Sequence, residues 1–118
     1  MKTHKDLDVW KEAMRLAGLI YECTGKFPRT EQFGLADQMR RAAVSIPSNI
    51  AEGAARQTNK EFIQFLYIAL GSCAELDTQC LLAINLKYFT DIDELSTSIE
   101  SVGKMLNGLI RHLKARNS

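Results

Sequence analysis

Apolar residues recur at alternating steps of three and four along most of the chain, which is the spacing of one face of an α-helix. The clearest stripe lies within residues 35–56 and consists of Leu35, Met39, Ala42, Ala43, Ile46 and Ile50. Pro47 lies in the middle of this stretch, where it removes one helical hydrogen bond and favours a bend. Because the apolar positions keep their phase on both sides of Pro47, the pattern predicts one continuous, bent helix.

A second side of the same helix carries charged and small polar residues at helical spacing, namely Asp37, Arg41, Ser45, Ser48 and Glu52. A face that only meets water is usually dense in lysine and glutamate. Small side chains such as Ser45, Ser48 and the adjacent Asn49 instead suit a face that another backbone approaches closely. We therefore treat these three residues as candidate contacts with a second subunit.

The periodicity predicts four helices and no strand of useful length. The first covers about residues 8–23, and the second starts near Thr30 or Glu31 and ends near residue 54. The third runs from about residue 58 to residue 86. The fourth begins near residues 91–93 and finishes with the basic residues Arg111, Lys114 and Arg116.

Residues at the predicted helix ends favour these boundaries. Gly25, followed by Pro28, suits the left-handed position that closes the first helix. Thr58 and Glu61 match a capping box at the start of the third helix. Since short connections favour antiparallel neighbours, residues 1–118 are predicted to form a single all-α domain, an antiparallel up-down-up-down four-helix bundle.

The third predicted helix is apolar around most of its circumference. Eight of the nine residues from Phe62 to Leu70 are apolar. One bundle core needs only one apolar stripe from each helix, and soluble monomers rarely expose a contiguous apolar patch. We therefore expect self-association, with Ile63, Tyr67 and Leu70 as candidate interface residues.

Composition and charge are compatible with a soluble globular protein but do not indicate a particular function. The chain is 46% hydrophobic and 25% charged, as is usual for soluble globular proteins, and its net charge of +1 demands neither nucleic acid nor a membrane as partner. The N-terminus lacks the apolar core of a secretory signal, and the longest uncharged tract, residues 62–74, is too short to span a bilayer. The three cysteines form no CxxC pair, so the expected location is the reducing cytoplasm.

No set of residues in the sequence predicts catalysis or metal binding. His4 and His112 lie far apart and outside any ligand spacing, and Ser45, Ser48 and Ser72 have no recognisable base nearby. The acidic residues near positions 91–94 stand at a helix start, where carboxylates are favoured anyway. We expect no enzyme activity, no cofactor, no metal and no small-molecule substrate.

Positive charge is concentrated in residues 1–60, which hold ten basic and seven acidic residues against five and seven in residues 61–118. Arginine forks bind phosphate well, so the candidate nucleic-acid contacts are Arg40, Arg41, Arg56 and Lys60, followed by Lys11 and Arg15. Asp37 lies one helical turn before Arg41 and can neutralise it. No aromatic residues alternate with these charges as a single-strand stacking surface requires. A solvent-exposed or inter-subunit role for the same residues stays open.

The chain resembles the bacterial four-helix-bundle proteins encoded by intervening sequences of 23S rRNA genes. The resemblance rests on Trp10 near the start, the unbroken run RRAAVSIPSNIAEG at residues 40–53, the segment EFIQFL at residues 61–66 and GSCAELDTQ at residues 71–79. It implies an antiparallel four-helix bundle assembled as a homopentamer with a central channel. It also implies distant kinship with the accessory protein of diversity-generating retroelements, which binds a reverse transcriptase and nucleic acid through a basic surface.

The sequence thus predicts a non-enzymatic, cytoplasmic, ring-forming bundle that acts as an adaptor associated with RNA or with a nucleic-acid-processing protein. The alternative is a protein-interaction scaffold with no nucleic-acid role. The surface distinguishes them: aligned arginines and lysines around a channel or rim favour nucleic acid, whereas basic residues paired within the chain favour the scaffold.

Overall fold

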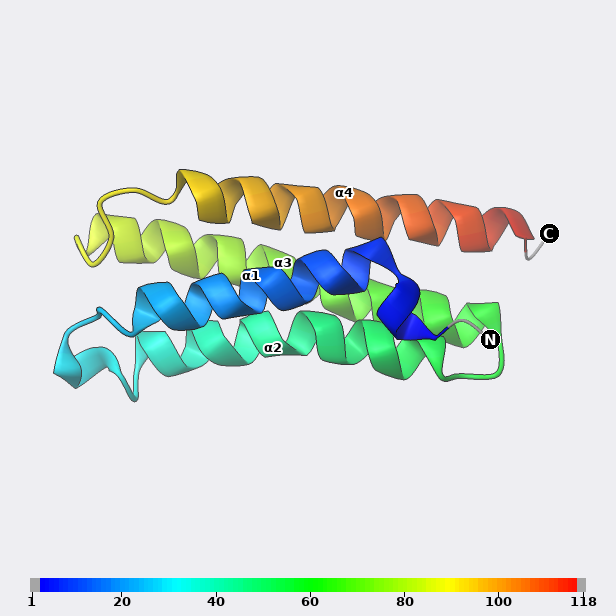
Figure 1. The fold of residues 1–118 in the computed structure, drawn as a ribbon, viewed down its shortest axis with the longest axis horizontal. Helices are drawn as coiled ribbons and strands as arrows, with labels where there is room; N and C mark the ends of the chain where they lie inside the picture. Colours follow the sequence, from blue (N-terminus) through cyan, green and yellow to red (C-terminus); the bar gives the residue numbers. More distant parts are fainter. Residues whose placement is uncertain (1–2, 117–118) are drawn as a thin grey trace.

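A computed structural model describes residues 3–116 and contains four long helices. They are α1 (Asp8–Thr24), α2 (Leu35–Ala54), α3 (Asn59–Asn85) and α4 (Asp93–Arg116), and short 3-10 helices cover His4–Asp6 (η1) and Arg29–Glu31 (η2). Successive helices run in opposite directions along a body of 48 × 20 × 20 Å (Figure 1). The predicted all-α four-helix bundle is confirmed, and the described residues form no strand.

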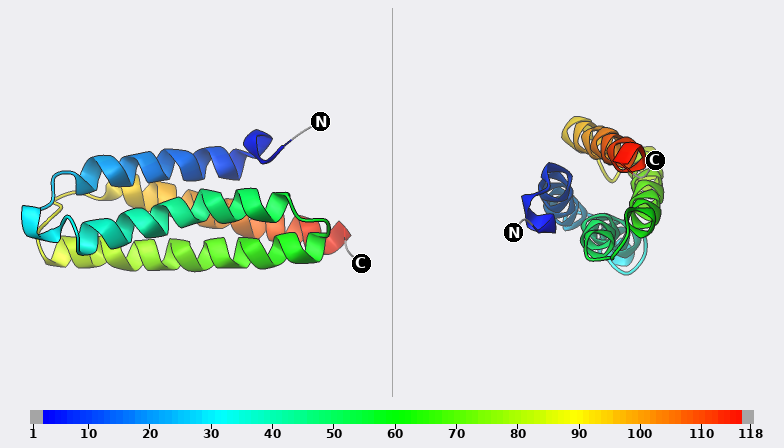
Figure 2. Two further views of the ribbon diagram at one scale, coloured as in Figure 1. Left: turned by 90° about the horizontal axis from the view of Figure 1, so that it is seen from below. Right: turned by 90° about the vertical axis from the view of Figure 1, so that its right-hand side faces the viewer.

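The helices stand in chain order around one axis, so that each packs against the next and α4 returns to α1, as the end-on view in Figure 2 shows. The core between them consists of the apolar stripes that the periodicity marked. From α2 it takes Leu35, Met39, Ala42, Ala43, Ile46 and Ile50. From α3 it takes Leu66, Ala69, Cys73, Leu76, Cys80 and Ala83.

Helix α2 continues through Pro47, as predicted, and the proline side chain is buried. The predicted start of this helix near Thr30 is wrong, because the α-helix begins only at Leu35. Pro28 permits no more than the short η2 turn, and Gly34 then adopts a non-helical conformation with φ −108° and ψ −112°.

The ends of the helices differ in detail from the capping expected. Gly25 is right-handed, with φ −59°, so the expectation of a left-handed glycine there is wrong. A left-handed residue instead closes α3: Lys87 has φ 66°. Its N–H donates to the Ile84 carbonyl at 3.0 Å and the Tyr88 N–H donates to the Ala83 carbonyl at 2.9 Å. These two bonds make a Schellman motif.

At the start of α3, Thr58 caps the helix as predicted. Its Oγ1 accepts a hydrogen bond from the Glu61 N–H at 3.2 Å. The reciprocal half of the capping box differs, because the Glu61 carboxylate accepts from the Thr58 hydroxyl at 3.0 Å. The cap therefore joins the same two residues through a different pair of atoms.

Candidate basic surface and assembly faces

Arg40 is half-buried and fixes the connection between α1 and α2. Its Nε donates to Thr24 Oγ1 at 2.9 Å, one terminal nitrogen donates to Gln32 Oε1 at 2.9 Å, and the guanidinium lies 5.5 Å from the centre of the Tyr21 ring. Gln32 in turn donates to the Thr24 and Phe27 carbonyls. Two of the three guanidinium nitrogens of Arg40 thus donate within the chain, so a phosphate would have to compete with Thr24 and Gln32 for them.

Arg41 and Arg56 are each paired with a carboxylate one turn earlier on α2. Arg41 Nε lies 3.0 Å from Asp37 Oδ2, as the spacing predicted, and Arg56 lies 3.0 Å from Glu52 Oε2. The Arg56 guanidinium also lies 4.9 Å from the centre of the Phe65 ring on α3. Exposed pairs of this kind contribute about 0–1 kcal/mol to stability, but they reduce the positive charge that a phosphate would meet.

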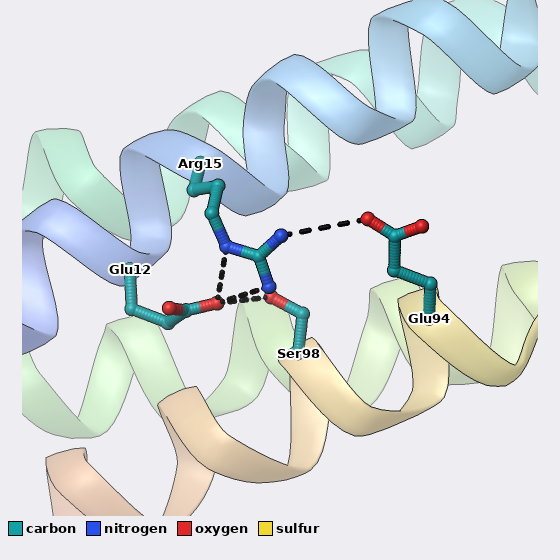
Figure 3. Close-up of polar contacts among 4 residues, drawn as sticks. All are labelled: Glu12, Arg15, Glu94 and Ser98. Atoms are coloured by element: carbon teal, nitrogen blue, oxygen red, sulfur yellow. Dashed lines mark hydrogen bonds and ion pairs between the residues drawn. The ribbon is translucent and has the colours of Figure 1, made fainter.

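Arg15 belongs to a polar cluster that joins α1 to α4 (Figure 3). Its Nε and one terminal nitrogen donate to Glu12 Oε2 at 3.1 and 2.9 Å, and its other terminal nitrogen lies 3.5 Å from a Glu94 oxygen. The Ser98 hydroxyl donates to the same Glu12 oxygen at 2.7 Å. The hydrogen bonds from Arg15 and then Ser98 lower the pKa of Glu12. Sequence spacing gave no sign of this cluster, because it depends on which face of α4 meets α1.

Lys11 and Lys60 are exposed, and neither forms an ion pair within residues 3–116. They occupy the first turns of α1 and α3. Of the six predicted nucleic-acid contacts, Lys11, Lys60 and Arg40 have no carboxylate partner in the part of the chain described, but only the two lysines are exposed. The six residues therefore do not form one shared basic site.

A different basic group gathers at the end of the bundle that holds the α2–α3 connection and the last turns of α4 (Figure 1). Lys114 Nζ donates to the Tyr67 hydroxyl at 2.8 Å and lies 5.3 Å from the centre of that ring, which places the end of α4 beside the beginning of α3. The basic end, as we call it, consists of Arg56, Lys60, Arg111, Lys114 and Arg116. In the sequence, the last three stand out only as basic residues at the end of a predicted helix. The antiparallel order of α3 and α4 already implied that they would lie near Lys60.

The small polar residues of α2 serve contacts inside the chain. Ser45 Oγ lies 2.9 Å from Ser72 Oγ on α3, and Asn49 Nδ2 donates to the Ser45 carbonyl and hydroxyl at 2.8 and 2.9 Å. The close approach that this stripe predicted is real, but its partner is α3 of the same chain. The described contacts of Ser45 and Asn49 are therefore internal, and their part in a subunit interface stays a prediction.

The remaining interface candidates divide between core and surface. Ile63 is only 9% exposed and belongs to the bundle core of the single chain. Leu70 is half-buried and lines a cavity of about 450 Å³ between α3 and α4. Tyr67 is 48% exposed on α3. Ser48 is exposed beside an apolar groove of about 380 Å³ between α1 and α2.

The described residues contain no cluster of metal ligands, and none of the three cysteine thiols has a lowered pKa. No group of three histidine, cysteine, aspartate or glutamate side chains that could hold a metal ion occurs among them. All three cysteines are free thiols, and burial raises the pKa of Cys73 to about 11 and that of Cys80 to about 12. No helix among residues 3–116 is long and apolar enough to cross a membrane.

Comparisons with known proteins agree with this geometry. The sequence profile described as "23S rRNA-intervening sequence protein" matches residues 5–108. A crystal structure of a protein of unknown function from the S23 ribosomal protein family of Bacteroides thetaiotaomicron superposes with a TM-score of 0.81 and 24% identity, covering 87% of this chain and 95% of that one. At this identity the likeness concerns the fold. No curated protein matches the chain significantly.

Proposed function

We propose that this chain, which belongs to the 23S rRNA-intervening sequence protein family, is a non-enzymatic cytoplasmic protein that assembles into a homo-oligomeric ring and acts as a binding scaffold. The observation that carries the proposal is the outer face of α3, which exposes several large apolar side chains; Tyr67 is contacted there by Lys114, but no helix of the described chain covers the face. Five subunits are what the family resemblance leads us to expect.

The outer face of α3 exposes large apolar side chains at intervals along most of the helix. They are Tyr67, Ile68, Leu81, Leu82 and Leu86, each between 45% and 53% exposed. Glu75 and Asp77 are the only charged residues between Phe62 and Leu86. Apolar surface of this extent is unusual on a soluble monomer and commonly marks an interaction site. Burial of one such side chain contributes about 1.5–3 kcal/mol, so a few of them suffice to drive association.

The pairing of the basic residues favours the scaffold over an RNA-binding role along the helix faces. Arg15, Arg41 and Arg56 are paired with carboxylates, and Arg40 is hydrogen-bonded within the α1–α2 connection. A phosphate backbone would have to compete with each of these contacts.

Multi-angle light scattering at micromolar concentration tests the proposal. We expect a mass that is a multiple of the 13.3 kDa chain, and five-fold if the family resemblance extends to the assembly. A mass of one chain would reject the scaffold as proposed, whereas a dimer would retain self-association and reject the pentamer.

The basic end supports a second candidate function, contact with RNA. There Lys60, Arg111 and Arg116 form no ion pair within the part of the chain described. Binding through them would weaken with rising salt, because neutralised phosphates release counterions. A gel shift with 23S rRNA fragments at low salt, using Lys60→Gln, is the test. Lys104→Gln is the matched control, since Lys104 is paired with Glu100 at 3.0 Å in the middle of α4. An unshifted wild-type protein, or equal effects of the two variants, would reject this second function.

A further inference from the structure

We infer that copies of this chain join head to tail, with the outer face of α3 of one copy seated in the groove between α1 and α2 of the next. The inference rests on the proposed self-assembly and names the two surfaces that meet. The partner is a second copy of this chain, and the spacing, shape and charge of the two surfaces favour it.

Helix α3 carries two parallel seams. The inner seam, buried in the bundle, is Leu66, Ala69, Cys73, Leu76, Cys80 and Ala83, at alternating steps of three and four. The outer seam, on the exposed side, is Tyr67, Gly71, Ala74, Thr78, Leu81 and Asn85, which has the same alternation and is free of charge. A seven-residue repeat of this kind is how one helix packs along another. The outer seam is therefore patterned to contact a further helix.

Gly71 strengthens this reading of the outer seam. A Cβ built on Gly71 meets no atom within 4 Å, so nothing inside the chain requires a glycine there. Glycine in a helix interior costs about 1 kcal/mol relative to alanine. With Ala74 and Thr78 in the following turns, it leaves the middle of the seam narrow, so that another helix can come close.

The groove between α1 and α2 is the complementary surface. Its walls are apolar: Trp10, Met14 and Ala17 come from α1, Val44, Pro47, Ser48 and Ala51 come from α2, and His4 of η1 closes one end. Met14 and Val44 are 48% and 42% exposed although both border the groove. A ridge of side chains from a third helix fits between two packed helices in the same way that ridges fit grooves within bundles.

The two surfaces lie on different sides of the bundle, because α3 stands between α2 and α4 (Figure 2), whereas the residues that line the groove belong to η1, α1 and α2. A two-fold contact of α3 with α3 would leave the groove uncovered and would bring like charges from Glu75 and Asp77 of both copies together. A head-to-tail contact covers both surfaces with one interface and generates rings when the rotation closes.

Charge favours the head-to-tail pairing as well. The only charged residues in the central part of α3, Glu75 and Asp77, are both acidic and exposed. On α1, which supplies one wall of the groove, Lys11 is exposed one turn before Met14 and has no carboxylate partner in the described chain, while Arg41 and Asp37 on α2 neutralise each other. Lys11 thus offers a charge opposite in sign to Glu75 and Asp77, while Asp8, also exposed and without an ion pair in the described chain, stands at the first residue of α1.

Mixing of two variants tests the inference. Leu81→Glu disables the α3 face but keeps the groove, and Val44→Glu disables the groove but keeps the α3 face. Each variant alone is expected to be a folded species of 13.3 kDa. A 1:1 mixture is expected to form a heterodimer of twice that mass, because one intact groove meets one intact α3 face. Met105→Glu, an exposed apolar position on α4, is the matched control and should assemble like the wild type.

The outcomes separate the inference from the proposed function. If the wild type assembles but the mixture stays monomeric, or if Val44→Glu assembles normally, the head-to-tail contact is refuted while self-assembly stands. A monomeric wild type refutes both. Circular dichroism checks folding, and the exposed Ile68→Glu and Met14→Glu replace either variant that proves unfolded.

Discussion

Replacement of Gly53 by alanine measures how closely α2 and α3 approach each other. An alanine Cβ at this position would lie 2.7 Å from Phe65 Cβ, 2.9 Å from Phe62 Cδ1 and 3.3 Å from the Phe62 carbonyl oxygen. Rotation of the Phe65 side chain does not move its Cβ, so the helices themselves must separate. Overpacking of this kind costs about 1–3 kcal/mol.

The gain in helix propensity acts against this steric cost, and a second glycine isolates the two effects. Gly18 lies in the interior of α1, and a Cβ there meets nothing within 4 Å. Gly18→Ala should therefore stabilise the protein by about 0.5–1 kcal/mol. Because Gly53 is near the end of α2, its own propensity gain is no larger. The difference in unfolding free energy between the two variants should then be about 1–3 kcal/mol in favour of Gly18→Ala.

Urea unfolding of both variants and the wild type, followed by circular dichroism at one protein concentration, gives this difference directly. The concentration must be fixed because self-association would contribute to apparent stability. Equal stabilisation by Gly53→Ala and Gly18→Ala would refute the close contact of α2 with α3 at Gly53.

Two further predictions concern titrating groups. Hydrogen bonds from Arg15 and Ser98 lower the pKa of Glu12 below 4.5 in the folded state, so its ionised form stabilises the fold above that pH, and the contribution is lost as pH falls through the lower folded-state pKa. The stability advantage of wild type over Glu12→Gln should therefore shrink below about pH 4.5, and a pH-independent difference in urea midpoints would contradict the cluster. Since burial raises the pKa of Cys80 to about 12, iodoacetamide at pH 8 should modify the half-buried Cys23 first; peptide mass spectrometry showing equal rates in the folded protein would contradict this burial.

Helix periodicity predicted the bundle because each helix carries a continuous apolar stripe, and one residue that disfavours a helix does not interrupt that stripe. Pro47 is an example, since the apolar phase across it correctly indicated a continuous α2. The start of α2 was misplaced because Thr30 and Glu31 have ordinary helix propensity, whereas the unusual backbone of Gly34 depends on how the connection packs. Local propensity is a weak guide where tertiary contacts decide a boundary.

The candidate sites were harder to predict because a pattern shows that a face is contacted but not by what. Ser45 and Asn49 correctly indicated a close approach, yet their partner is Ser72 on α3 of the same chain. Ile63 was counted as surplus apolar surface, although the bundle core accommodates it. Arginine is a residue type that commonly binds phosphate. The hydrogen bonds of Arg40 to Thr24 and Gln32 could not be predicted from the sequence, because they form only when the α1–α2 connection is folded.

Assembly and the basic end are linked by the shape of the chain. The bundle is more than twice as long as it is wide, and the basic end lies at one tip of the long axis. The contact inferred between α3 and the α1–α2 groove runs along helix sides, so it leaves both tips uncovered. If the rotation axis of a ring is nearly parallel to the long axis of the bundle, every copy has the same orientation along that axis. The uncompensated charges of Lys60, Arg111 and Arg116 would then repeat around one rim. Several weak phosphate contacts on one rim bind far more tightly than a single one, through effective concentration. A ring of this kind would give a near-neutral chain a repeated basic edge, so the proposed assembly and the proposed contact with RNA support each other and do not compete.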